Sequence, residues 1–384
     1  MLLIRPKFVA LDSSHLGKVA EDKASKDSAR LQRAATFEKS FEESGGVLLL
    51  CWHHFQELLS HGNEDVAAQR AAYLQSLPLV AAIASFQKED LVGSVLDLQA
   101  FEVAAAFENV SADPEMVRNE AAKRMFRLTS GADLVRPFLE NWSALRAGFS
   151  ASEERSQEVV AISKSDFAGM SDVKIVDLIK GELLPKDAML QRLWGLHGRL
   201  AADIKERGDD RIVDPELTSR EFFEDVVSRY GAISTDNPAL RILEMFGVGM
   251  SEIGPNTTVA DVGDLATFRK KLVLLNYRLG LPLPEVVAKV KEERLPSGII
   301  FNAIRTLHPD TRKWDGSELT DWHMSCLAAY ADVTYVDKRT HEAFRIARQK
   351  SKTFASLARD VKKAGSYSDI AAQLSAPPSE IGAA

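Results

Sequence analysis

Cysteine is scarce in this chain, with two among 384 residues, and both lie in apolar runs. Cys51 and Cys326 are too few for a zinc ribbon or a disulfide framework, and their setting predicts buried free thiols in a reducing compartment. Long apolar runs are also missing. The longest, near residues 77–86, is too short to span a bilayer, and Arg5 and Lys7 interrupt the apolar start of the chain. We therefore expect a soluble, cytoplasmic protein with no membrane contact.

Several well-known sequence motifs are absent as well. There is no phosphate-binding GxxxxGK[ST] loop and no GxSxG nucleophile elbow, and Gly247-Val248-Gly249 lacks the rest of a dinucleotide-binding fingerprint. The formal net charge of −7 argues against general polyanion binding but is compatible with a local basic groove. These absences direct attention to the acidic residues.

One stretch near the C-terminal end, residues 319–340, carries two of these acidic residues. Asp321 lies in the first turn of an apolar helix for which Thr320 is the expected N-cap. Residues 333–336 are β-branched and aromatic, which predicts a short buried parallel strand, and Asp337 follows them directly. Ligands bind at the carboxyl ends of strands in open α/β sheets, so an acidic residue there is a functional candidate.

The beginning of the chain has the same arrangement. Residues 8–11 and 47–52 are apolar runs with the length of buried strands. Asp12 follows the first run, and Glu57 lies on the helix predicted after the second run, at 53–61. The C-terminal part adds a basic helix, a final strand and a short last helix, expected at 340–351, 356–363 and 366–374.

The middle of the chain, residues 63–316, is helical by pattern, with Pro, Gly and capping residues between the helices. Asp113-Pro114, for example, places Pro in the first turn of a helix expected over 114–128. We therefore predict an α/β core that is interrupted by a large all-α insertion. Its parts are expected at 1–62 and 317–376 for the core, 63–316 for the insertion and 377–384 for a disordered tail.

The four acidic residues, taken in order, resemble the acidic quartet of the PIN-domain nucleases. The resemblance is carried by Leu11-Asp12-Ser13-Ser14, Phe55-Gln56-Glu57-Leu58, Thr320-Asp321 and the run from Val333 to Asp337. It implies a PIN-like three-layer α/β core with a central parallel sheet. It also implies a catalytic metal site that binds Mg²⁺ or Mn²⁺ and cuts RNA, or DNA in structural relatives, with the ligands Asp12, Glu57, Asp321 and Asp337.

Two further positions bear on this resemblance. Ser13 matches the small hydroxyl residue that follows the first acid. Tyr335 occupies a position where Thr or Ser is usual, although Thr334 is adjacent. A tyrosine ring in that place would reshape or fill the metal pocket, so the resemblance leaves this point open.

The chemistry of phosphodiester hydrolysis favours such a site independently of the resemblance. The reaction must stabilise an attacking hydroxide and a leaving alkoxide around a charged phosphate, which hard divalent cations held by oxygen ligands can do. Taken alone, Asp12 and Asp337 are explained equally well as helix-cap or turn residues, whereas Glu57 is better explained as a solvated helix residue and Asp321 as a first-turn acid. The four together, each at the expected element, predict the metal site.

A basic run follows Asp337 and suggests contacts with a nucleic acid. The expected contacts are Ser13, Lys338, Arg339, Arg345 and Arg348, although the basic residues can equally form a solvated helix face. RNA is preferred over DNA because of the resemblance. The helical insertion is expected to serve substrate gating, a homodimer contact or the binding of a regulatory protein. A toxin or phage-defence role is a hypothesis from the pairing of a compact nuclease with a helical appendage.

Two alternatives remain open. His53, Glu57 and His61 fall on one helix face, as a transition-metal site would require, but there is no HExxH pattern and the histidines can pack near the sheet edge instead. The chain can also be a catalytically inactive PIN-like core that carries a helical interaction or scaffold module. A nuclease assay with Mg²⁺ or Mn²⁺ separates the enzyme from the scaffold.

Overall fold

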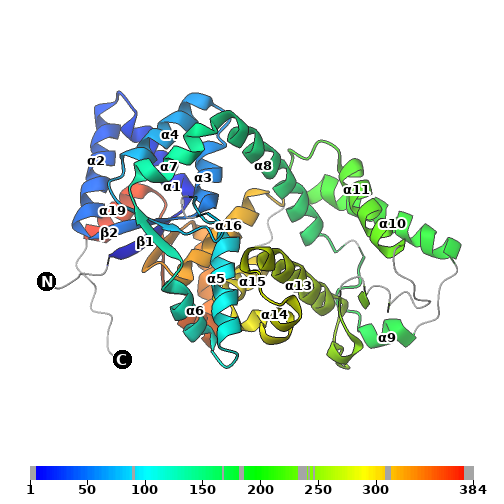
Figure 1. Ribbon diagram of the computed structural model, residues 1–384. Helices are drawn as coiled ribbons and strands as arrows, with labels where there is room; N and C mark the ends of the chain where they lie inside the picture. Colours follow the sequence, from blue (N-terminus) through cyan, green and yellow to red (C-terminus); the bar gives the residue numbers. More distant parts are fainter. Residues whose placement is uncertain are drawn as a thin grey trace. The chain divides into compact units, whose positions relative to one another are not determined.

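The computed structural model describes residues 6–88, 91–166, 168–180, 186–231, 240, 243–244, 247–307 and 313–375. The chain forms two compact units, whose elements are labelled in Figure 1. We call the first the sheet unit, which contains Met1–Ser150, Leu275–Pro309 and Thr320–Ala384. We call the second the helical unit, which contains Ala151–Leu274 and Asp310–Leu319.

A six-stranded sheet forms the centre of the sheet unit, with the strand order β4-β3-β2-β1-β5-β6. All neighbouring strands pair in parallel except β3 and β4, which are antiparallel. The chain runs from β1 outward to β2 and β3 on one side, and later to β5 and β6 on the other. The carboxyl ends of β1 and β5 therefore form the crevice where open α/β sheets bind ligands. The strands are β1 Lys7–Leu11, β2 Gly46–Leu50, β3 Val80–Ile83, β4 Phe126–Thr129, β5 Val333–Val336 and β6 Asp360–Lys363.

Helices cover both faces of this sheet (Figure 1). Alternate strand residues such as Val9, Leu11 and Tyr335 pack against the first group of helices in one apolar core. The first group is α1 Ser13–Lys23, α2 Ser28–Glu43, α3 Trp52–Leu59, α4 Glu64–Ser76, α7 Gly131–Glu140 and α19 Tyr367–Ser375. The second group is α5 Val95–Glu108, α6 Pro114–Ala122, α14 Leu283–Lys289, η2 Glu292–Arg294, α15 Pro296–Leu307, η3 Cys326–Ala329, α17 Lys338–Lys350 and α18 Lys352–Leu357.

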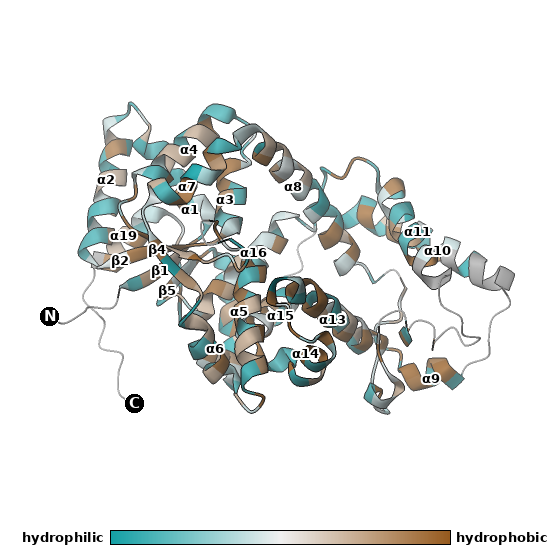
Figure 2. Cartoon of the chain, viewed as in Figure 1, coloured by the Kyte–Doolittle hydropathy of each residue, from teal (hydrophilic) through white to brown (hydrophobic). Residues whose placement is uncertain are grey.

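Hydropathy along the helices matches their burial. α2 alternates between hydrophilic and hydrophobic positions (Figure 2), and it buries Ala34, Phe37 and Ser40. α5 is mostly hydrophobic (Figure 2) and is buried along most of its length. Its buried Glu102 accepts hydrogen bonds from Ser297 and from the Tyr330 hydroxyl, which satisfies the carboxylate inside the core.

The helical unit contains two small apolar clusters. One joins Val160, Leu200, Phe223 and Trp314, and the other includes Ile175. None of the helices in the described part of the chain has the length and apolar character needed to cross a membrane. The remaining elements are α8 Trp142–Lys164, α9 Ile175–Lys180, α10 Lys186–Arg207, α11 Pro215–Gly231, η1 Met250–Glu252, α13 Val259–Leu279 and α16 Ser317–Ser325.

The predicted α/β class is confirmed, and strands lie within the runs predicted at 8–11, 47–52 and 333–336, although β2 ends at Leu50. The strand predicted over 356–363 forms only at Asp360–Lys363, because its first residues belong to α18. The prediction of helices throughout 63–316 is wrong at two places, because β3 and β4 lie in this range and extend the sheet. The run containing β3 is short and alanine-rich, so its period does not distinguish strand from helix.

The boundaries also differ from those predicted. The first division between units falls after Ser150 rather than at residue 62, because α4 to α7 pack with the sheet. Thr320 is not an N-cap, since α16 already begins at Ser317. The expected helix over 114–128 ends at Ala122. The predicted tail at 377–384 lies outside the described residues.

Gly131→Ala should destabilise the sheet unit. Gly131 begins α7, and a Cβ added there would lie 1.8 Å from the carbonyl oxygen of Leu74 in α4. We expect the free energy of unfolding to fall by about 1–3 kcal/mol, measured by urea denaturation. Gly148→Ala is the matched control: nothing lies within 4 Å of its added Cβ, and alanine favours a helix over glycine by about 1 kcal/mol. Equal stabilities would contradict the α4–α7 packing.

Candidate metal centre

Asp12 and Asp337 follow neighbouring parallel strands. Leu11 pairs with Tyr335 in the sheet, and the backbone N–H of Asp12 donates to the carbonyl oxygen of Tyr335 at 3.1 Å. Each aspartate caps the helix that follows it. Asp12 Oδ1 accepts from Ser14 N at 2.8 Å, and Asp337 Oδ1 accepts from Thr340 N at 2.7 Å. Capping occupies one carboxylate oxygen and fixes the side chain at the end of its strand.

Asp321 brings the four acids into one region. Burial, together with the charges of Asp12, Glu57 and Asp337, raises the pKa of its carboxyl from an ordinary 3.8 to about 8, while Arg339 opposes this change. Charges act this strongly only over short distances in a partly desolvated site. The other three predicted ligands, from α3 and the ends of β1 and β5, therefore lie near enough to Asp321 to act on its charge, and Asp321 holds a proton at neutral pH.

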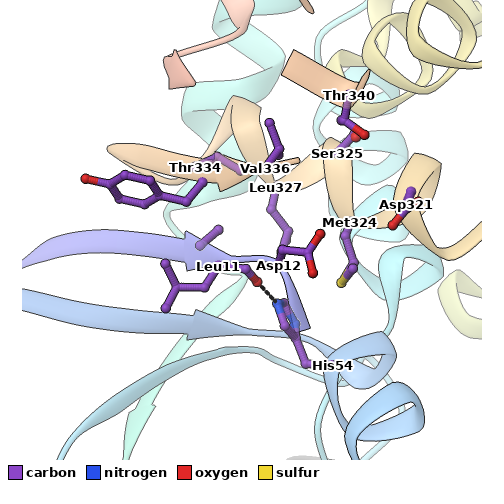
Figure 3. A pocket seen from close by; sticks show the side chains of 12 residues that line it. Leu11, Asp12, His54, Asp321, Met324, Ser325, Leu327, Thr334, Val336 and Thr340 are labelled. Carbon is purple, nitrogen blue, oxygen red and sulfur yellow. Dashed lines mark hydrogen bonds between the residues drawn. The ribbon is translucent and has the colours of Figure 1, made fainter. Parts of the chain in front are cut away.

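Asp12 and Asp321 line the same small cavity, of about 20 Å³ (Figure 3). Its volume suits one water molecule. The hydroxyls of Ser325 and Thr334 also line it, and both are buried without a hydrogen-bond partner in the described part of the chain. A buried hydroxyl without a partner is costly, so these two oxygens point to a polar occupant of the cavity.

The donor types around Asp321 suit a hard divalent cation, because carboxylate and hydroxyl oxygens are the ligands that Mg²⁺ and Mn²⁺ prefer. The side chains are not yet arranged as a complete metal-binding site, however. Among the described residues, no group of three or more His, Cys, Asp or Glu side chains lies close enough together to hold a metal ion. Asp12 and Asp337 each use one carboxylate oxygen to accept a hydrogen bond from a helix amide. The other oxygen of Asp337, Oδ2, lies 3.6 Å from Arg339 Nε. Rotation of these side chains would be needed to form the full ligand set.

Tyr335 does not bring its ring to the carboxylates. It is 1% exposed and belongs to the apolar core together with Val9 and Leu11. Successive residues of a strand face opposite sides of the sheet, so the side chain of Thr334 points to the face opposite the Tyr335 ring. Both residues contribute to the lining of the cavity.

Two histidines near the acids were not expected at the site. His54, the third residue of α3, interacts through Nδ1 with the N–H of Cys51 and through Nε2 with the carbonyl oxygen of Leu11, and burial lowers its pKa (Figure 3). It thus holds the end of β1 next to Asp12. His15 is buried on α1, where burial lowers its pKa while the charges of Asp12, Asp369 and Asp337 oppose that change.

Helical spacing could have identified some of the residues that line the cavity. His54 lies one turn before Glu57, and Met324 and Ser325 lie one turn after Asp321, so each shares a helix face with a predicted ligand. His15 gives no comparable signal, because its approach to Asp337 depends on how α1 and β5 pack.

The predicted nucleic-acid contacts have different roles in the structure. Ser13 is buried, and its hydroxyl faces Met324 Sδ at 3.6 Å. Lys338 and Arg339 are exposed beside Asp337. Arg345 is exposed but pairs with Glu342, and Arg348 donates to the carbonyl oxygens of Ala358 and Arg359 before β6. Only Lys338 and Arg339 thus combine exposure with closeness to the acids.

The alternative transition-metal set is not assembled. His53 stacks on His323, with ring centroids 4.8 Å apart, and burial lowers the pKa of His53 to about 4. His61 instead interacts with the backbone of Asn63. These contacts agree with the ordinary packing role considered for the histidines.

Comparison of the chain with protein-family models, with curated proteins and with solved structures gives no match.

Asp321→Asn should stabilise the metal-free protein. The folded state keeps a proton on Asp321 that the unfolded state releases above about pH 4, so this residue lowers stability as pH rises from about 4 to about 8. Asparagine removes this dependence. We expect a gain of about 1–3 kcal/mol at pH 8 and little at pH 4, because a pKa unit is worth about 1.4 kcal/mol and the side chain is partly solvated. Urea denaturation in the presence of EDTA measures the free energy of unfolding of both proteins at the two pH values.

Asp113→Asn is the control for this experiment, because Asp113 is an exposed N-cap of α6 outside the site. Its stability relative to wild type should be the same at both pH values. An Asp321→Asn protein no more stable than wild type at pH 8 would show that burial and the neighbouring acids do not raise the pKa of Asp321.

Proposed function

We propose that the sheet unit is a PIN-like nuclease core that hydrolyses phosphodiester bonds with Mg²⁺ or Mn²⁺, with RNA as the preferred substrate. The observation that carries this proposal is the cavity that Asp12 and Asp321 line together. The pKa of Asp321, raised to about 8 by burial and by the charges of Asp12, Glu57 and Asp337, supports it. Acids held together at a stability cost are characteristic of functional sites. Their place at the carboxyl ends of β1 and β5 agrees with ligand binding at a switch point of the sheet.

The four acids would hold the metal, and the hydroxyls of Thr334 and Ser325 would orient water beside it. A bound Mg²⁺ or Mn²⁺ supplies an activated water and neutralises charge on the phosphate. Asp321 must give up its proton to become a ligand, so metal binding releases that proton. His54 holds the end of β1 and keeps Asp12 in place.

Lys338 and Arg339 would bind the phosphate backbone. They begin α17 directly after Asp337, so their positive charges and the amides of a helix N-terminus lie beside the acids. Arg339 lies 3.6 Å from Asp337 in the metal-free site. A substrate phosphate would offer the guanidinium a second partner once Asp337 turns to the metal.

One observation favours an inactive core that serves as a scaffold. Among the described residues, no cluster of three or more His, Cys, Asp or Glu side chains is already arranged to hold a metal ion. Metal binding and cleavage are therefore tested separately. A scaffold would show neither.

Asp12→Asn and Asp337→Asn should abolish Mn²⁺-dependent cleavage of RNA. Each substitution removes a charged ligand, whose loss of several kcal/mol corresponds to about 100-fold or more in rate. Asparagine caps helices as well as aspartate does, so α1 and α17 should remain folded. Cleavage of labelled single-stranded RNA and DNA is measured in parallel, with RNA expected to be cut faster. Asp113→Asn is again the control, and wild type cutting no faster than Asp12→Asn would exclude the enzyme.

Mn²⁺ should raise the thermal midpoint of wild type. Saturation at about 100 times the dissociation constant adds about 2.7 kcal/mol of stability. Asp12→Asn and Asp337→Asn should lose most of the shift, whereas Asp113→Asn should retain it, as measured by differential scanning fluorimetry with EDTA as the reference. An equal shift in all four proteins would place the metal elsewhere.

A further inference from the structure

A second cavity lies within the sheet unit, at the end of the sheet opposite the acids. Its volume is about 530 Å³, which falls in the range of small-molecule sites. Gly46, the first residue of β2, and Leu79, the residue before β3, both line it. Because β1, β2 and β3 run in parallel, these amino ends share the edge of the sheet that faces away from Asp12 and Asp337. A ligand in this cavity would not overlap the candidate metal centre.

Most of the residues that line this cavity are apolar side chains of α2, of β2 and of the segment between α4 and β3. They include Phe37, Phe41, Val47, Leu48, Leu77 and Leu79. The rings of Phe37 and Phe41 have centroids 5.6 Å apart. Leu79 is 48% exposed, which leaves a large apolar side chain open to water beside the cavity. Such a lining favours a ligand whose apolar body displaces that water.

Tyr73 of α4 gives the cavity a buried polar group. It is 5% exposed and lines the cavity, and within the described part of the chain its hydroxyl makes no hydrogen bond. Leaving a buried hydroxyl without a partner is costly, so this group points to a polar atom of a ligand. Burial and the charge of Glu38 raise the pKa of Tyr73. The side chain therefore stays a neutral hydroxyl, whose oxygen can accept a hydrogen bond.

The charged side chains that line the cavity carry a net negative charge. Lys23 Nζ lies 2.6 Å from Glu38 Oε1, so these two charges compensate each other. Glu42 is exposed, and its carboxylate forms no ion pair with any residue that the structure describes. Glu38 and Glu42 are four residues apart on α2 and thus lie on the same helix face as the nearby Tyr73 hydroxyl. This arrangement favours a cation over an anion, and aromatic rings also attract cations.

We propose that this cavity binds a small organic ammonium ion with an apolar body about the size of a phenyl ring. The body packs against Phe41 and Leu77, and the ammonium group donates to the Tyr73 hydroxyl oxygen and lies near the Glu42 carboxylate. The inference does not depend on the proposed nuclease function. Because α2, α4 and β2 together form the wall, an occupied cavity stabilises the sheet unit whether or not the protein cuts RNA.

The test uses three probes that share a phenylethyl body and differ in charge. Phenethylamine is cationic at neutral pH, phenethyl alcohol is neutral and hydrocinnamate is anionic. Binding to the whole chain is followed by NMR through the methyl resonances of Val47, Leu77 and Leu79. We expect phenethylamine to bind with a Kd of about 1 mM, as suits a ligand of this size. The alcohol should bind about 3- to 5-fold more weakly, and hydrocinnamate should not bind measurably.

Substitutions of the two polar partners test the assignment of the ammonium group. Glu42→Gln should weaken phenethylamine binding about 3- to 5-fold and leave the alcohol unchanged, because only a charge is removed. Tyr73→Phe should weaken phenethylamine binding about 2- to 10-fold, because the ammonium group loses a hydrogen bond. Glu43→Gln is the matched control, since Glu43 is exposed next to Glu42 and pairs with Lys39 at 3.8 Å outside the cavity. It should bind phenethylamine as wild type does.

Ser76→Trp tests the location, because Ser76 is exposed and lines the cavity, so an indole there would fill the space. It should abolish binding of phenethylamine, with an unchanged far-ultraviolet circular dichroism spectrum as the check on folding. Binding of hydrocinnamate as tight as that of phenethylamine, or an equal loss in Glu42→Gln and Glu43→Gln, would overturn the ammonium assignment. Methyl resonances that no probe moves, or that move equally in Ser76→Trp, would show that the cavity binds no such ligand.

Discussion

The burial of the Asp321 carboxyl beside three other acids is the constraint on which the candidate site depends. It shows in Asp321, whose pKa is raised to about 8 by burial and by Asp12, Glu57 and Asp337. A protein gains nothing in stability from such an arrangement, and the rest of the fold must maintain it. The parallel pairing of β1 with β5 and the packing of α3 and α16 do so by fixing where each side chain begins.

Two of the four proposed metal ligands are also helix caps in this protein. Asp12 and Asp337 each end a strand and begin a helix, and each uses one oxygen for an amide of that helix. The cap stabilises the local structure and leaves the second oxygen for other partners. An ordinary capping role therefore does not compete with a role in metal binding. It explains how two flexible carboxylates are kept at adjacent strand ends before any ligand is present.

The sequence by itself determined the α/β class, the order of the acids and the places of β1, β2, β5 and, with looser bounds, β6. Continuous apolar runs that end in an acidic residue are a local signal for the first three of these strands. It did not determine β3, β4 or the boundary after Ser150, since a short alanine-rich strand is defined by its neighbours in the sheet. Tertiary structure alone decided that Tyr335 packs into the core, that Arg348 holds the turn before β6, and that His15 and His54 border the acids. These roles depend on contacts between residues far apart in the chain, which no local pattern records.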